Sequence, residues 1–406
     1  MSCHPRVTAW TLVIQTHLPH VRKAQATGLA LGSLGLVLAR SCALTAVSTF
    51  LATWRHRKDE AVRQQWRAFC DEATAQRGTA RCALAVQPCF LLLLAWILGQ
   101  WEGTPLARAL DATTLGRRFP VLALRVVSRG CAIPVAWAVR LATAQQTWRR
   151  EWVRMRRPVH RAVPRSWTVM VLAEWGLYAR WLFRRITRLG WHPFWRINLG
   201  GTFRPQSQRR AAPLNTWVPE PGTTWQGTGI ACKGRHRQRH CPWLACWEAG
   251  DKDPWLILTA MPPETRTAWW YGLRAWIAQG FKITTRAGGP WQHTRMTQPE
   301  RAARLWLAVA VATLGRLSVG GEADETIPAS TRLDVTTLVP QPARTRCATR
   351  LRLVRLFRRG WNLILVAWLD HAPLPLGRFV PEPWPAVPVL AEEPPCLPRL
   401  ALPQAA

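Results

Sequence analysis

One predicted helix carries four positions on a single face. Residues 269–286 are expected to be helical, and four of them follow one another at spacings of three, four and seven: Tyr271, Arg274, Ala278 and Thr285. At 3.6 residues per turn, these spacings align all four side chains. An active site could therefore lie against this face of the helix.

A lone carboxylate interrupts an apolar segment earlier in the chain. Asp111 lies within residues 106–113, the first of three predicted strands, and the strands at 119–127 and 131–139 are joined as a hairpin at 128–130. A carboxylate in an apolar strand costs desolvation free energy unless a cation compensates it. Asp111 is therefore a candidate metal ligand, and a cap at a strand end or turn is the alternative role.

A group of cysteines and histidines has ligand types that suit zinc: Cys232, His236, His240, Cys241 and Cys246. It lacks a C-x2-C pair, and a basic loop with incidental thiols explains it equally. The eleven cysteines are odd in number, show no paired spacing and follow no secretory signal. They predict reduced thiols in the cytoplasm.

The composition is strongly basic, with a net charge of +33 over 406 residues. Arginine supplies nearly all of it, because the chain has only five lysines. Arginine binds phosphate through two parallel hydrogen bonds and stacks on bases, so a polyanionic partner is expected, with nucleic acid first and an anionic membrane surface second. The apolar fraction of 48% supports a packed core and excludes disorder throughout.

Tryptophan is unusually frequent, with 26 residues against two tyrosines. Several stand among arginines: Trp148, Trp152, Trp175, Trp181 and Trp195. They are either stacking platforms for bases or substitutions accumulated without strong selection. Residues 54–77 present a similar choice between a DNA-contacting basic helix and a merely solvated one.

The spacing in the helix at 269–286 resembles the Y-x2-R-x3-E-x6-K signature of bacterial DDE transposases of insertion sequence family four. Tyr271 and Arg274 match that signature, whereas Ala278 stands at the Glu position and Thr285 at the Lys position. The segment around Asp111 is similar to the first strands of the family's RNase H-like core, in which Asp111 matches the first catalytic Asp. The run Leu-Ala-Glu-Trp-Gly-Leu at 172–177 resembles the motif of the second, with Glu174 in place of Asp.

The resemblance implies a metal-dependent DNA strand-transfer enzyme. Asp111 and Glu174 would be both catalytic residues and ligands of Mg2+, and the third acid is missing at Ala278. The nearest acid before it, Glu264, lies about 21 Å away on a continuous helix. Glu300 is read as part of a capping box with Thr297 as the N-cap. Weak or absent catalysis is therefore expected. Residues expected to contact DNA are Tyr271, Arg274, Lys282 and Arg286.

The expected fold class is α/β, an RNase H-like catalytic core with a β-rich insertion, preceded by an all-α N-terminal domain. The expected division is a helical, DNA-binding N-terminal domain at 1–100, the first part of the core at 101–198, the insertion at 199–263, the helical second part at 264–320, a basic helical region at 321–370 and a proline-rich disordered tail at 371–406. The apolar runs near residues 29–51 and 82–98 are too interrupted for membrane helices.

Two readings of function follow from different classes of protein. The first is an insertion-sequence transposase, catalytically impaired, that binds transposon ends as a homo-oligomer in the cytoplasm, associated with the nucleoid. The alternative is a non-catalytic DNA-binding repressor or a relic derived from a transposase. The replaced acidic positions, Glu174 and Ala278, together with an intact basic surface, favour the second reading.

Overall fold

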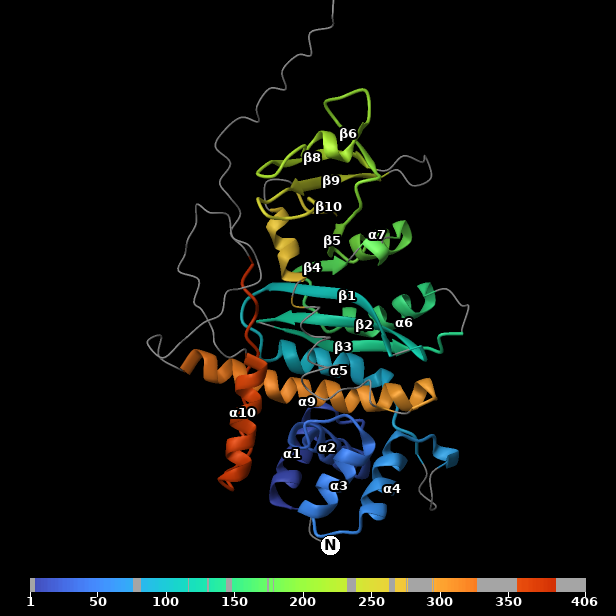
Figure 1. The fold of residues 1–406 in the computed structure, drawn as a ribbon, viewed down its shortest axis with the longest axis vertical. Coiled ribbons are helices and arrows are strands. Elements are labelled where there is room, and N and C mark those ends of the chain that lie inside the picture. Colours follow the sequence, from blue (N-terminus) through green and yellow to red (C-terminus); the bar gives the residue numbers. More distant parts are fainter. Residues whose placement is uncertain are drawn as a thin grey trace, which may run out of the picture.

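A single ten-stranded sheet runs through the protein, with helices on both of its faces and at one end (Figure 1). This computed structural model describes residues 4–75, 82–115, 117–129, 131–143, 148–173, 175–177, 179–231, 239–262, 267–274, 276, 294, 296–326 and 356–384. The strand order is β3-β2-β1-β4-β5-β10-β9-β8-β6-β7. The expected α/β class is confirmed at this level.

The N-terminal segment is helical, as predicted. Its elements are α1 (Pro5–His17), α2 (Lys23–Leu38), α3 (Leu44–Trp54), α4 (Asp59–Cys70), the 3-10 turn η1 (Ala73–Ala75) and α5 (Gln87–Leu98). Small residues let α2 approach its neighbours, because a Cβ on Gly32 would stand 2.0 Å from the Trp66 ring of α4. Buried side chains of these helices belong to the same hydrophobic core as those of the sheet.

The first three strands form the predicted antiparallel meander: β1 (Pro105–Leu115), β2 (Phe119–Ser128) and β3 (Cys131–Val139). Next come α6 (Arg149–His160), β4 (Thr168–Ala173), the turn η2 (Trp175–Leu177), α7 (Arg180–Thr187) and β5 (His192–Arg196). Both β4 and β5 run parallel to β1, since β4 pairs with β1 and β5 with β4 in parallel register. Parallel neighbours require crossover connections, which α6 and α7 provide.

The remaining strands extend the same sheet beyond β5. They are β6 (Thr202–Pro205), β7 (Ala212–Pro213), β8 (Thr224–Ala231), β9 (Arg239–Cys246) and β10 (Trp255–Thr259), with the turn η3 (Leu214–Thr216). Antiparallel pairing of β10 with β5 makes the join. An aromatic cluster packs here, in which Trp225 lies 5.3 Å from Phe203 and 4.9 Å from Trp243 between ring centroids.

Tryptophans thus serve mainly as core residues where the structure describes them. Of the five that stand among arginines, Trp152 and Trp195 are buried, Trp181 is half-buried, and Trp148 is exposed. Trp175 lies in η2, and its side chain is outside the described part of the chain. Base stacking is therefore open to Trp148 but closed to Trp152 and Trp195 in this conformation.

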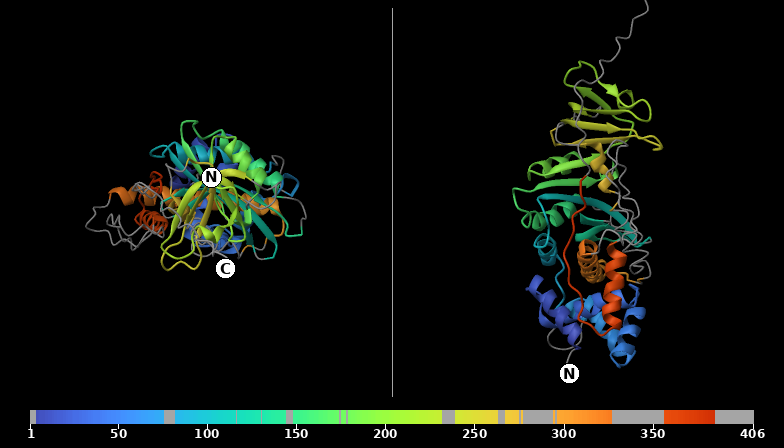
Figure 2. Two further views of the ribbon diagram at one scale, coloured as in Figure 1. Left: turned by 90° about the horizontal axis from the view of Figure 1, so that it is seen from above. Right: turned by 90° about the vertical axis from the view of Figure 1, so that its left-hand side faces the viewer.

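Two helices from the C-terminal part of the chain connect the sheet to the N-terminal helices by packing. The long helix α9 (Pro299–Thr326) packs on α2, α4 and β3, and α10 (Leu356–Leu369) crosses α9 (Figures 1 and 2). Their close approach depends on glycine, because a Cβ on Gly360 would meet the Arg316 carbonyl oxygen at 1.8 Å. By length and composition, α9 could cross a membrane, but 89% of that apolar window is buried inside the protein.

Three details differ from the sequence predictions. Helix α9 begins at Pro299 and the Ala302 amide donates to the Gln298 carbonyl, so Gln298 rather than Thr297 is the N-cap. The predicted helix at 269–286 begins as a 3-10 helix, η5 (Ala268–Arg274). The tail predicted to be disordered from residue 371 is extended but packed up to Trp384, because Phe379 is buried and bridges to Trp101.

Candidate active site

The candidate site lies on the face of the sheet that η5 covers. Ala107 and Ala109 of β1 and Met170 and Leu172 of β4 form a second hydrophobic cluster with η5 side chains. Because side chains alternate along a strand, Asp111 shares the face of Ala107 and Ala109. This places the predicted first acid on the same face as η5.

The register between β1 and β4 bears directly on the two predicted acids. The last parallel pair is Leu110 opposite Ala173, and each of these residues immediately precedes one of the acids in the sequence. Asp111 is half-buried near the centre of β1, opposite Ala123 of β2. Glu174 lies outside the residues that the structure describes.

Asp111 has a cationic neighbour in Arg125 of β2. Its Oδ1 accepts a hydrogen bond of 2.7 Å from the Ala112 amide. Arg125 is fully buried opposite Ala109, on the same face, and its Nη1 donates to the Ala132 carbonyl at 3.1 Å. Burial lowers the pKa of Arg125 to about 10, while electrostatic interaction with the Cys131 and Asp111 side chains opposes that change.

Arg125 is the functional residue that the sequence prediction missed. The expected compensation for Asp111 was a metal ion, whereas a guanidinium stands close enough to favour the charged carboxylate. The available signal was an arginine inside the apolar run Val-Leu-Ala-Leu-Arg-Val-Val at 121–127. Its proximity to Asp111 depends on cross-strand register, which that run does not reveal.

The 3-10 helix η5 brings Tyr271 and Arg274 to the site face. Tyr271 is 4% exposed, and its ring lies edge-on to Trp255 of β10 at 5.7 Å, whereas Arg274 is half-buried. In this conformation, Tyr271 offers DNA little surface. The other predicted positions on this segment, Ala278, Lys282, Thr285 and Arg286, lie outside the described residues, as does Glu264.

The described groups do not make a two-metal site. Magnesium takes oxygen ligands in near-octahedral geometry, and a pair of ions needs several shared carboxylates. Of the predicted acids, the described part of this face contributes Asp111, which already has a guanidinium nearby. Nowhere in the described ranges do three His, Cys, Asp or Glu side chains gather in a way that could hold a metal. We therefore derive no catalytic step through a metal.

The predicted zinc cluster is only partly within the described residues. Cys232 and His236 lie outside them. On β9, His240 is exposed and lies 2.8 Å from the Gln206 amide nitrogen, while Cys241 and Cys246 are buried. Burial and the nearby Glu248 raise the pKa of the Cys246 thiol to about 12. The thiolate form that binds zinc is therefore disfavoured at this position.

A basic groove lies between α6 and the start of α5. Four exposed arginines of α6 line it: Arg149, Arg150, Arg154 and Arg157. Spacings of four and three place the last three on one helix face. No acidic partner meets these four within the described chain, because Glu151, the acid of α6, pairs with Arg140 at 3.4 Å. The groove is suited to a polyanion.

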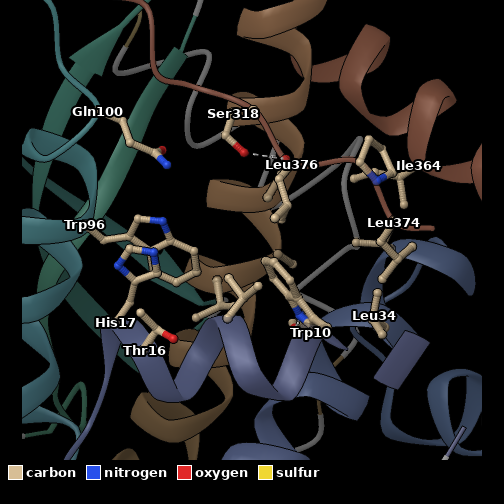
Figure 3. A pocket seen from close by; sticks show the side chains of 18 residues that line it. Trp10, Thr16, His17, Leu34, Trp96, Gln100, Ser318, Ile364, Leu374 and Leu376 are labelled. Atoms are coloured by element: carbon tan, nitrogen blue, oxygen red, sulfur yellow. Dashed lines mark hydrogen bonds between the residues drawn. The ribbon is translucent and has the colours of Figure 1, made fainter. Parts of the chain in front are cut away.

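A mainly apolar pocket of about 170 Å³ lies elsewhere, between α1, α2, α5, α9, α10 and the segment at 374–377 (Figure 3). The His17 ring stacks on Trp96 at 4.2 Å, and Trp10 donates to the Ser33 hydroxyl at 2.8 Å. Its described lining includes no acid, lysine, arginine or cysteine. The pocket lacks groups for catalysis, and none of its lining residues belongs to the site face.

Comparison with family models gave no match, and neither did comparison with curated proteins. Among solved structures, the chain is similar to a piggyBac transposase in a synaptic complex with hairpin DNA, determined by cryo-EM. The sequence identity is 9%, the TM-score is 0.40, and the match covers 76% of this chain and 72% of that one. A likeness of this extent does not establish the fold or the function of this chain.

Proposed function

We propose that this chain is a transposase-type DNA-binding protein, of insertion-sequence origin, whose metal-dependent strand-transfer centre is impaired. The observation that carries the proposal is the parallel pairing of Leu110 with Ala173. The residue after each is an acid, on strands that were expected to bear the first two catalytic positions. The two acids are therefore adjacent in register, each directly after the last residue pair that joins β1 to β4.

The strand order supports an RNase H-like core within this proposal. An antiparallel meander, β3-β2-β1, continues through the parallel strands β4 and β5, and helices form the crossovers. In the same scheme, β6 to β10 are the β-rich insertion, and the segment that begins with η5 provides the third catalytic position.

The impairment is proposed from three residues. Ala278 has no oxygen to give a metal, Glu174 is one methylene longer than the expected Asp, and Arg125 competes with a cation for Asp111. When bound, Mg2+ would supply Lewis-acid activation of the phosphodiester. The ligands available for that role are Asp111 and Glu174. Two carboxylates in place of three leave the site short of oxygen ligands.

DNA is the proposed partner, bound at transposon ends, and a homo-oligomer on DNA is part of the proposal. The exposed arginines of the α6 groove support contact with a phosphate backbone. Arg274, Lys282 and Arg286 are proposed as further contacts near the site, and Tyr271 is proposed as one only in a conformation that exposes its ring. A cytoplasmic, nucleoid-associated location is proposed with this function.

A non-catalytic repressor is the second candidate. The buried guanidinium of Arg125 favours it, because a charge that compensates Asp111 from within the protein removes the need for a metal there. Such a protein would occupy transposon ends without cutting them. A relic with neither activity is the remaining form of this alternative.

Cleavage of a labelled transposon-end duplex in Mg2+ or Mn2+ tests these readings. Wild type is compared with the Glu174→Asp, Ala278→Glu double variant, and with the same variant carrying Asp111→Asn. Cleavage by the double variant alone, lost with Asp111→Asn, supports an impaired transposase. Strong cleavage by wild type would contradict the proposed impairment.

DNA binding is measured separately on the same proteins. Replacing Arg150, Arg154 and Arg157 by glutamine is expected to weaken binding uniformly across sequences. It should also reduce the slope of log K against log salt by about one for each arginine that neutralises a phosphate in the wild-type complex. Binding without cleavage in all variants supports the repressor. Absence of both activities supports the relic.

A further inference from the structure

A buried arginine without a hydrogen-bond partner lies under α6. Arg108 of β1 points to the face opposite Asp111 and is 1% exposed. Within the described residues, none of its three guanidinium nitrogens has a hydrogen-bond partner. Its only polar compensation there is the Trp191 ring, whose centroid lies 4.6 Å from the guanidinium carbon.

The space beside this guanidinium is small and mainly apolar. A cavity of about 10 Å³ is lined by Arg108 and Arg156 and by seven apolar side chains: Leu110, Leu124, Trp152, Val171, Leu182, Ile186 and Trp191. That volume is the space open to the centre of a water-sized sphere, so one water or one monatomic ion somewhat larger than water can occupy the cavity. Larger ligands such as phosphate or a carboxylic acid do not fit.

The titratable groups near the cavity are basic in the described part of the chain, and burial lowers the pKa of His160. Arg156 of α6 lies near Arg108, and His160 of the same helix faces both. Arg156 donates through Nη1 to the Arg185 carbonyl at 3.3 Å, and its Nε has no partner in the described chain. Burial and then Arg156 lower the pKa of Arg108 to about 9. At neutral pH, Arg108 therefore remains charged.

A charged group taken out of water is strongly destabilising unless it is paired. Stacking on one indole offsets only part of that desolvation free energy. Among the described residues, no carboxylate lines the cavity to complete a pair. A small anion would satisfy the unused donors of Arg108 and Arg156 together.

We propose that this cavity binds one monovalent inorganic anion of the size of chloride, held between the guanidinium groups of Arg108 and Arg156. The anion joins β1 to α6 and thereby fixes the helix that carries the exposed arginine groove. This site stands on the opposite face of the sheet from Asp111 and does not depend on the proposed DNA chemistry.

Thermal unfolding of the full chain at constant ionic strength tests the proposal. Sodium gluconate, whose anion is too large for the cavity, is replaced stepwise by sodium chloride or sodium bromide. Wild type is expected to show a saturable upward shift of the unfolding midpoint. Arg108→Leu should lose the saturable part, and Arg154→Leu, which removes an exposed charge from the same helix, should keep it.

Equal halide responses in wild type and Arg108→Leu would overturn the proposal, as would no response in wild type. Bromide-soaked crystals of wild type give a second measurement that is independent of how the variant folds. An anomalous peak between Arg108 and Arg156 is expected. Water there, with no peak at high bromide concentration, would contradict the proposed site.

Discussion

Replacing Asp324 by alanine is expected to destabilise the packing of α9 against α10 and the β2–β3 hairpin. Asp324 is 1% exposed, and its two oxygens accept from different elements. Oδ2 lies 3.1 Å from Arg129 Nη1 beside the hairpin, and Oδ1 lies 3.2 Å from Arg359 Nη1 on α10. The substitution leaves two like charges facing an empty space.

The magnitude follows from the burial of the three groups. Removing one partner of a buried ion pair typically costs about 3–5 kcal/mol. The side chains of Arg129 and Arg359 are 30% and 17% exposed, so water can solvate them in the variant. We therefore expect a loss of about 2–3 kcal/mol in the free energy of unfolding.

The control is Glu322→Ala on the same helix. Glu322 lies 3.3 Å from Arg378, and the two side chains are 44% and 40% exposed, so its loss should cost less than about 1 kcal/mol. Urea unfolding of the full chain, followed by tryptophan fluorescence, gives both midpoints. If Asp324→Ala unfolds at the same urea concentration as Glu322→Ala, the buried ion pairs of Asp324 do not stabilise the fold and the reasoning is wrong.

Three further outcomes are expected. Gly360→Ala should lower the melting temperature, because the added Cβ would meet the Arg316 carbonyl oxygen at 1.8 Å; an unchanged value would contradict the close helix contact. In native protein at pH 8, iodoacetamide should alkylate Cys42 far more slowly than the half-buried Cys82, because burial raises the pKa of the Cys42 thiol to about 12. Mass spectrometry of the peptides measures both alkylation rates. Burial lowers the pKa of His17 below 6.5, so the unfolded chain binds more protons than the folded protein just below that pH. The stability of the folded protein therefore falls as the pH drops through this window. His17→Phe should weaken that pH dependence in melting curves recorded from pH 5 to 7.

Much of the local structure could be predicted from the sequence. The meander of β1 to β3 follows from apolar runs separated by turn residues, and β4 and β10 follow from short β-branched or aromatic runs. These signals lie within a few residues of one another along the chain. Helix α9 was equally predictable, apart from the position of its N-cap.

The parts that could not be predicted depend on contacts between distant residues. Arg125 faces Asp111 only because of the register in which β2 pairs with β1. Tyr271 of η5 is buried against Trp255 of β10, although its helical spacing suggested a face open to an active site. The proline-rich tail packs because Phe379 finds Trp101, and composition alone says nothing of such a partner.

The position of α9 has a consequence for synthesis on the ribosome. The N-terminal helices bury much of their apolar surface against α9, which begins about 260 residues after α2 ends. At roughly 5–20 residues per second, about 13 to 52 s separate the appearance of these partners. During that interval, the nascent helices expose surfaces that only the last third of the chain can cover. A holding chaperone would protect these surfaces until α9 has emerged.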